Sequence, residues 1–164
     1  MTNCQECPGG LFGAYEGMNV CEACAAGTFS SAIGAKSSVV CSPCPPGTRS
    51  LAGFTACSVC TSGKYAEGFG TPECNDCPEG TYGPNSSMSE CSACEAGKYS
   101  SAIGAIDHTV CSSCTAGKYS YAGSSVCTPC AGGFYSAEVS AESIDVCLPC
   151  PSAYYSRDGQ SSCT

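Results

Sequence analysis

The sequence predicts a small disulfide-rich repeat protein, an elongated rod of tandem short β-turn modules that are cross-linked by local disulfides and contain almost no helix. Three observations predict this fold class. The 164 residues include 19 cysteines, whereas Leu, Ile, Val and Phe together number only 20. The cysteines recur at regular spacing, and no segment shows the sustained apolar periodicity of an amphipathic helix. Because so few aliphatic side chains cannot build an ordinary core, we expect covalent cross-links to replace it.

The cysteines define the modules. They form nine C-x-x-C pairs that are followed by gaps of 12 to 16 residues, and Cys163 ends the last gap alone. Glycine stands three residues after the second cysteine of each pair and an aromatic residue stands five after it, but Arg49 breaks the aromatic rule and Ala153 breaks the glycine rule. The pairs are Cys4/Cys7, Cys21/Cys24, Cys41/Cys44, Cys57/Cys60, Cys74/Cys77, Cys91/Cys94, Cys111/Cys114, Cys127/Cys130 and Cys147/Cys150.

Each module is expected to be a short strand, a turn and a return. A glycine at a fixed position suits a tight turn with positive φ. Proline precedes this glycine at Pro8, Pro45 and Pro78, where it suits position i+1 of the turn. The aromatic residue that follows favours β structure, and a second glycine later in most modules turns the chain back.

A longer period of 70 residues lies above the modules. Adding 70 to each cysteine from Cys4 to Cys60 gives another cysteine, and the hexapeptide 30–35 recurs at 100–105. After Cys130 the register slips by three residues. We therefore predict two super-repeats of four modules and a partial third that is out of phase. The predicted domains are residues 1–73, 74–143 and 144–164.

Charge and composition exclude several classes of function. The formal net charge is −8, and the six basic residues are spread singly along the chain. Nucleic acid, heparin and anionic lipid need clustered positive charge, so we expect none of them as a partner. No apolar run is long enough to span a membrane, and the N-terminus lacks the pattern of a signal peptide. His108, the single histidine, has no free cysteine beside it, so we expect no catalytic residue.

C-x-x-C pairs at this spacing are also typical of zinc sites. A zinc module needs four ligands, however, and nine pairs plus one cysteine leave an awkward remainder with only one histidine available. The recurrent glycine and aromatic residue lie inside the long gap, where they shape a closed loop. We therefore favour disulfides over zinc and expect no metal and no cofactor.

Two stretches resemble a known family. Residues 77–82 read C-P-E-G-T-Y and residues 94–100 read C-E-A-G-K-Y-S. They resemble the ephrin-receptor-like cysteine repeat and are similar to the first sub-module of tumour necrosis factor receptor cysteine-rich domains. In those families the cysteine before x-x-Gly-x-Tyr bonds to the next cysteine along the chain. The resemblance implies a ladder of bridges: Cys7–Cys21, Cys24–Cys41, Cys44–Cys57, Cys60–Cys74, Cys77–Cys91, Cys94–Cys111, Cys114–Cys127, Cys130–Cys147 and Cys150–Cys163.

The spacing agrees with this ladder, because closing each loop contributes about 3 kcal/mol in the chain-entropy description. We expect each module to contact only its neighbours. One Tyr or Phe per module, packed on its disulfide and on the next module, would form the whole apolar seam. Cys4 is left over. Either the chain is part of a longer repeat protein that holds its partner, or Cys4 bonds to another molecule.

These features predict a non-catalytic extracellular structural protein, secreted or on the outer face of the cell surface. We expect a segment of a cell-surface or filament-forming glycoprotein, whose partners are other copies of itself, other extracellular proteins or glycans. Asn85 begins the sequon Asn-Ser-Ser and is the expected glycosylation site. The alternative is a ligand-binding receptor ectodomain, and Arg49 with Leu51 and Phe54, in the module without its aromatic residue, is the departure that this alternative predicts.

Overall fold

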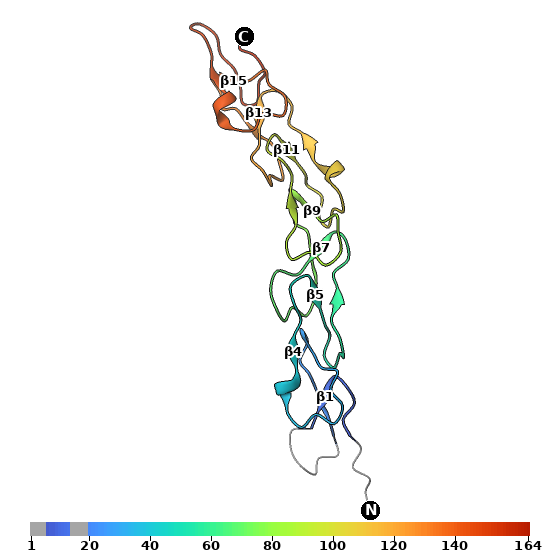
Figure 1. Ribbon diagram of the computed structural model, residues 1–164. Coiled ribbons are helices and arrows are strands. Elements are labelled where there is room, and N and C mark those ends of the chain that lie inside the picture. The colour runs from blue at the N-terminus through green and yellow to red at the C-terminus, as the bar shows by residue number, and fades with distance from the viewer. Residues whose placement is uncertain (1–5, 14–19) are drawn as a thin grey trace, which may run out of the picture. The chain divides into compact units, whose positions relative to one another are not determined.

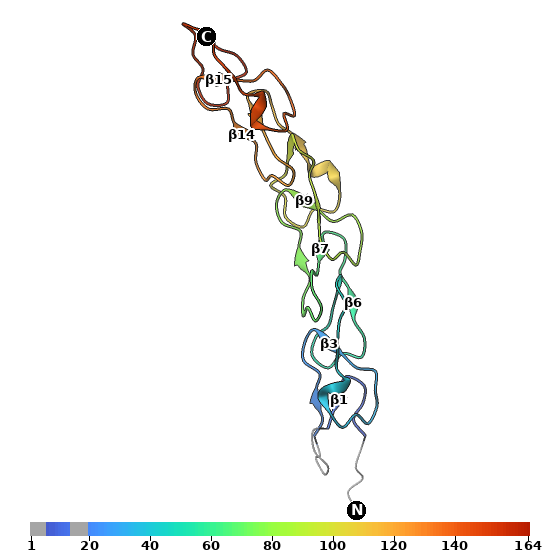
Figure 2. The same cartoon turned by 60° about the vertical axis from the view of Figure 1, so that its left-hand side comes forward.

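Every module except the last, which the Cys150–Cys163 disulfide closes, folds as a two-stranded antiparallel hairpin. The computed structural model describes residues 6–13 and 20–164 (Figure 1, Figure 2). Among these residues there is no α-helix. The 3₁₀ turns are η1 (Ser38–Val40), η2 (His108–Val110) and η3 (Ile144–Val146). The strands are β1 (Leu11–Phe12), β2 (Glu22–Ala23), β3 (Thr28–Phe29), β4 (Ser42–Pro43), β5 (Thr48–Arg49), β6 (Ser58–Val59), β7 (Lys64–Tyr65), β8 (Asn75–Asp76), β9 (Thr81–Tyr82), β10 (Ser92–Ala93), β11 (Lys98–Tyr99), β12 (Ser112–Ser113), β13 (Lys118–Tyr119), β14 (Thr128–Pro129), β15 (Phe134–Tyr135) and β16 (Leu148–Pro149).

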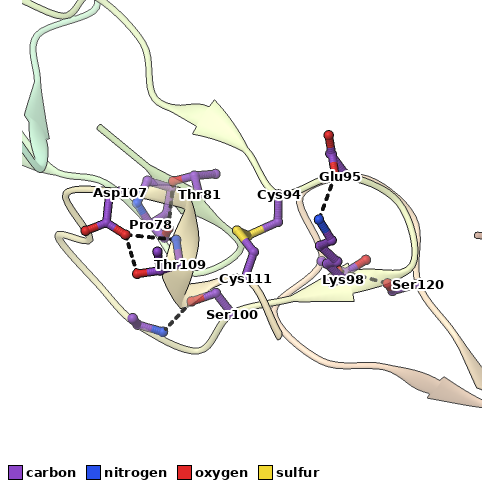
Figure 3. The surroundings of a disulfide bond; sticks show 12 residues. Pro78, Thr81, Cys94, Glu95, Lys98, Ser100, Asp107, Thr109, Cys111 and Ser120 are labelled. Atoms are coloured by element: carbon purple, nitrogen blue, oxygen red, sulfur yellow. Dashed lines mark hydrogen bonds and ion pairs between the residues drawn. A yellow bond between two sulfur atoms is a disulfide. The ribbon is translucent and has the colours of Figure 1, made fainter. Parts of the chain in front are cut away.

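The hairpins join sequence motifs that recur in every module. The first strand holds the aromatic position, and the second strand holds the two residues inside the next C-x-x-C pair. In β11–β12, for example, Tyr99 lies opposite Ser112. The Cys94–Cys111 disulfide closes the same hairpin (Figure 3). Isolated two-residue strands are too short to persist in water, so the disulfide is what holds each pair together. The predicted fold class, a disulfide-rich repeat of short β modules with almost no helix, is confirmed.

The described chain divides into two compact units. Of the described residues, unit 1 comprises 6–13, 20–76 and 85–90, and unit 2 comprises 77–84 and 91–164. The disulfides up to Cys60–Cys74 lie in unit 1, and the others lie in unit 2. The predicted division into two super-repeats and a partial third stays a prediction.

The turn that opens each hairpin has glycine at its third position. In unit 1 the N–H of Thr28 donates to the carbonyl of Ala25 at 3.0 Å, and Gly27 between them has a φ of 85°. A positive φ at the third position of a β-turn is type II geometry, which glycine adopts without strain. The invariable place of the glycine after the cysteine is thus explained by this turn.

The predicted place of the prolines in this turn is wrong. The carbonyls of Pro8, Pro45 and Pro78 each accept the closing bond of the turn, from the N–H three residues on, at 3.1 Å. These prolines therefore occupy position i and not position i+1. The reason is the glycine, which must stand at position i+2 and lies two residues after each proline.

Neighbouring modules are joined by backbone hydrogen bonds. In unit 2 the N–H of Gly97 donates to the carbonyl of Ser120 in the next module, and the carbonyl of Gly97 accepts from Cys114, each at 2.9 Å. The N–H of Gly123 returns to the carbonyl of Cys94, also at 2.9 Å. The stacking of modules therefore depends on the main chain and not on the identity of exposed side chains.

The core of each unit is made mostly of sulfur and serine. The residue after the aromatic position is always Ser, Ala or Gly, and Ser50, Ser120 and Ser136 are at most 1% exposed. Among the aromatic residues, Phe12 and Tyr119 are buried but most others are half-buried. The expectation that the rings form the whole seam is therefore wrong. The cysteines with the lowest exposure, at most 1%, are Cys24, Cys44, Cys60, Cys77, Cys94, Cys114 and Cys130.

The buried hydroxyls are tolerated because each has a partner. Ser120 Oγ donates to the carbonyl of Lys98 at 2.9 Å, and Ser50 Oγ donates to the carbonyl of Thr28 at the same distance. Both bonds join a module to the one before it. A buried hydroxyl without a partner would cost free energy. No buried side-chain nitrogen or oxygen in the described part of the chain lacks a partner.

Modules also contact their second neighbours along the chain, which the sequence did not predict. A Cβ built on Gly97 would lie 2.1 Å from the carbonyl oxygen of Ser140, two modules further on. A Cβ built on Gly27 in unit 1 would lie 1.9 Å from the carbonyl oxygen of Gly70. At Gly27 and Gly97 the glycine of the turn is thus needed for close approach as well as for its φ.

Ala153 keeps the turn although it lacks the freedom of glycine. Its φ is 70°, and the N–H of Tyr154 still donates to the carbonyl of Pro151 at 3.1 Å. We expect Ala153→Gly to raise the free energy of unfolding by about 0.5–1 kcal/mol, because it removes the strain of a left-handed alanine. Denaturant unfolding of the full chain measures this change. Ser152→Gly, one residue earlier and without a positive φ, is the control and should not stabilise.

Candidate functional site

Nine disulfides join cysteines of the described residues, and they are the bonds that the family resemblance implies. Their Cα–Cα distances lie between 5.6 and 5.8 Å. Because these cysteines are bonded, they offer no thiolate for a metal or for nucleophilic attack. Within the described ranges, no three His, Cys, Asp or Glu residues gather as metal ligands. Cys4 lies outside the described residues. The bonds are Cys7–Cys21, Cys24–Cys41, Cys44–Cys57, Cys60–Cys74, Cys77–Cys91, Cys94–Cys111, Cys114–Cys127, Cys130–Cys147 and Cys150–Cys163.

The loop that carries Asn85 is exposed. Asn85, Ser86 and Ser87 all lie at the surface, and Ser87 has a φ of 61°. The N–H of Ser87 donates to the carbonyl of Cys60 at 2.8 Å, so the main chain of the loop is anchored while its side chains face solvent. The Asn85 amide is therefore accessible for a glycan.

We expect the chain, secreted from eukaryotic cells, to carry one N-linked glycan at Asn85. The glycan should slow the electrophoretic migration of the chain, and treatment with a peptide N-glycosidase should reverse this shift. Asn85→Gln should migrate like the enzyme-treated chain. Ser87→Thr keeps the sequon and should keep the shift, whereas Ser87→Ala should lose it. A mobility that is the same in all four proteins would contradict the assignment.

His108 lies in η2, beside a capping carboxylate. The Asp107 carboxylate accepts from the Thr109 N–H at 2.8 Å and from the Thr109 hydroxyl (Figure 3). Ser37 and Ser143 cap η1 and η3 in the same way. The exposed His108 ring lies 6.3 Å from the Tyr82 ring, between centroids. These contacts give His108 and Asp107 structural roles at a turn.

The hydrogen bond from the Thr109 side chain, and then that from its backbone, lowers the pKa of Asp107 below its ordinary value. A folded-state pKa below the unfolded one means that the cap stabilises above the unfolded pKa, and that this stabilisation is lost as pH falls through the folded pKa. We expect NMR titration to place the Asp107 midpoint below the value of about 3.9 for free aspartate. A midpoint at or above that value would contradict the hydrogen-bonded cap. Asp107→Ser should keep the cap and remove this acid sensitivity.

Two grooves occupy equivalent places in the two units. The groove in unit 1 has a volume of about 360 Å³, and the groove in unit 2 has a volume of about 210 Å³. Each groove lies between one module and the next, over a disulfide, and the first five lining residues of each are 70 apart. The unit 1 groove is lined by Arg49, Val59, Cys60, Thr61, Lys64, Glu73 and Cys74. The unit 2 groove is lined by Tyr119, Pro129, Cys130, Ala131, Phe134, Ile144 and Cys147.

The grooves share a backbone but differ in chemistry. Arg49 stands where Tyr119 stands in unit 2, and Lys64 stands where Phe134 does. The unit 1 groove is therefore charged and the unit 2 groove is apolar. Lys64 Nζ lies 2.5 Å from the carboxylate of Asp76, across β7 and β8.

The sequence singled out Arg49 but not the groove. Leu51 and Phe54, which were expected to act with Arg49, do not line it; the N–H of Phe54 donates to the carbonyl of Leu51 in a turn. A comparison of residues 70 apart would have exposed the change from charged to apolar side chains. That these positions face one hollow could not be known without the stacking of modules.

Residues 63–111 match the model of the family described as tyrosine-protein kinase ephrin type A/B receptor-like. No curated protein matches the chain. The matched family is a cysteine-rich, receptor-like module without catalytic function. Together with nine disulfides it indicates an extracellular location. Among the described residues, no helix is long and apolar enough to cross a bilayer. Residues 63–111 are therefore an ephrin-receptor-like cysteine-rich segment, and the same ladder of disulfides continues on both sides of it.

Proposed function

We propose that this chain is a non-catalytic structural segment of an extracellular cell-surface or filament-forming glycoprotein, which assembles through surfaces that recur along the chain. The observation that supports this proposal is a loop that occurs twice. Residues 30–35 and 100–105 have the same sequence. In both loops the serine hydroxyl accepts from the N–H two residues on at 3.2 Å.

The repeated loop presents an apolar side chain. Ile33 is 72% exposed and Ile103 is 67% exposed. Each precedes a glycine whose N–H donates to a carbonyl of the module before, at 2.7 Å in unit 1 and 2.8 Å in unit 2. Both units therefore present an exposed isoleucine on a loop whose main chain is held by a hydrogen bond to the module before. Weak contacts that recur on one molecule add up through effective concentration, so a repeated surface favours assembly.

Assembly can be tested by removing the repeated side chain. Sedimentation velocity and electron microscopy of the full chain should show periodic assemblies, and Ile33→Ser with Ile103→Ser should shift assembly to higher concentration. Val39→Ser is the matched control, because Val39 is 87% exposed but its counterpart 70 residues on is threonine. Isolated monomers at every concentration would contradict the proposal.

The alternative function is a ligand-binding receptor ectodomain. Two observations favour it: the match to a receptor-like family and the replacement of an aromatic residue by Arg49 at a groove. A receptor concentrates its binding energy in one distinctive site, whereas an assembling repeat distributes it over many. Monomers that capture a soluble extracellular protein, and lose it on Arg49→Tyr, would support the receptor.

A further inference from the structure

The unit 1 groove has a cation without a partner. Lys64 is already paired with Asp76. Arg49, by contrast, makes no ion pair among the described residues. Glu73 is the third charged residue that lines the groove. Because Asp76 neutralises Lys64, Arg49 and Glu73 are the charges of the lining that form no ion pair among the described residues. A guanidinium at the wall of a hollow is suited to receive a carboxylate in a bidentate manner.

The equivalent groove in unit 2 shows what Arg49 has displaced. There the position is filled by Tyr119, which is only 8% exposed and packs edge-on against Tyr121 with ring centroids 5.8 Å apart. The groove with a tyrosine is smaller, at about 210 Å³ against about 360 Å³. The unit 1 groove is thus wider and carries the Arg49 guanidinium where the unit 2 groove carries a buried ring.

The chain itself carries a segment that complements this hollow. Glu138 and Glu142 are exposed in unit 2 and form no ion pair among the described residues. Between them lies Val139, which is 65% exposed. The unit 1 groove in turn offers Val59, which is 55% exposed. A carboxylate beside an apolar side chain therefore matches a groove that offers an unpaired guanidinium and the exposed Val59.

We propose that the Arg49 groove of unit 1 receives the segment 138–142 of unit 2 from a second copy of this chain. The Arg49 guanidinium donates to the carboxylate of Glu138 or Glu142, and Val139 packs against Val59. This inference rests on the proposed self-assembly and names one of its contacts. Like charge over the rest of the acidic surface disfavours other registers.

The contact is heterologous, because a groove on one copy meets a different surface on the next. Each added copy leaves one groove and one acidic segment unused. Contacts of this kind continue into an open chain unless the rotation between copies closes a ring. The proposal therefore predicts assemblies that grow with concentration and shrink with added salt, since salt screens partly exposed ion pairs.

The test compares the full chain with Arg49→Tyr, which restores the residue found at the equivalent position in unit 2 and should fold well. Sedimentation velocity at about 50 mM and about 500 mM salt measures association. We expect Arg49→Tyr to weaken association by about tenfold or more, which corresponds to the loss of one partly buried ion pair. Lys36→Ala is the control, because it removes an exposed cation of unit 1 outside the groove and should change association little.

A charge exchange identifies the partner segment. Arg49→Glu alone should prevent association, and Glu138→Lys with Glu142→Lys should also prevent it. When these two proteins are mixed, each groove again meets a segment of opposite charge, so association should return. If the mixture stays monomeric, the assigned segment is wrong.

The outcomes separate this inference from the proposed function. A wild-type chain that stays monomeric overturns both. If the wild-type chain, Arg49→Tyr and Lys36→Ala all assemble equally well, only the groove contact is overturned. Assembly through the repeated isoleucine loops then stands. Binding of a different acidic protein to the groove, lost in Arg49→Tyr while the chain stays monomeric, would support the receptor alternative instead.

Discussion

Gly97→Ala is expected to destabilise unit 2 far more than Gly133→Ala, although the two glycines stand at the same position of their turns. Their φ values are 80° and 85°, so both substitutions force alanine into the left-handed region, at about 1–2 kcal/mol. At Gly97 the new Cβ would also meet the carbonyl oxygen of Ser140 at 2.1 Å, whereas at Gly133 nothing lies within 4 Å. Moving a packed backbone costs about 1–3 kcal/mol more.

The two glycines are matched in their hydrogen bonds as well. The N–H of Gly97 donates to Ser120 at 2.9 Å, and the N–H of Gly133 donates to Ser156 at 3.0 Å. Guanidinium unfolding of the oxidised full chain, followed by the near-ultraviolet signal of its tyrosines, measures both variants. Equal losses in the two variants would show that φ alone requires the glycine and that the contact between second neighbours contributes nothing.

Removing the Cys114–Cys127 disulfide by substituting both cysteines with alanine should lower the free energy of unfolding by about 2–5 kcal/mol. The cross-link restricts the unfolded chain, and its removal also leaves a hole, because Cys114 is fully buried. Cys114 Sγ in addition lies 3.3 Å from the buried Ser120 Oγ. The expected loss therefore combines loop closure with packing.

The Cys150–Cys163 disulfide separates these two contributions. It joins residues 13 apart, as the Cys114–Cys127 disulfide does, so the loop-closure contribution is the same in both. Neither Cys150 nor Cys163 is fully buried. Removing the Cys150–Cys163 disulfide should therefore lower the free energy of unfolding by less than removing Cys114–Cys127 does. The difference is the packing contribution of the buried sulfur atoms. If removing the terminal bond costs as much, the buried sulfur contributes little and chain entropy explains the whole effect.

Much of the local structure could be predicted from the residues. The spacing of glycine after each C-x-x-C pair predicts the turn, because a positive φ is needed at one fixed place, and Gly27 and Gly97 have it. The aromatic residue after the turn predicts the first strand of every hairpin except β5–β6, where Arg49 replaces it. The prolines were placed one position too late, because proline is common at i+1 and the turn type was not known. Choosing between the two required the hydrogen bond that closes the turn.

The burial of serine could not be predicted in the same way. Serine is usually exposed, and the sequence holds many serines at exposed turns. Ser50 and Ser120 can be buried because a carbonyl of the preceding module accepts the hydrogen bond from each hydroxyl. The signal in the sequence was weak but present: the position after the aromatic residue is always small.

By itself the sequence determined the modules, their boundaries and the small number of apolar residues that makes disulfides necessary. These features follow from contacts between residues less than one module apart, and short-range propensities and cysteine spacing describe such contacts well. The tertiary structure alone decided which residues meet across modules: Gly97 against Ser140, and Arg49 and Lys64 around one hollow. These contacts between modules depend on how the hairpins stack through their main chains, and local propensities do not encode that stacking.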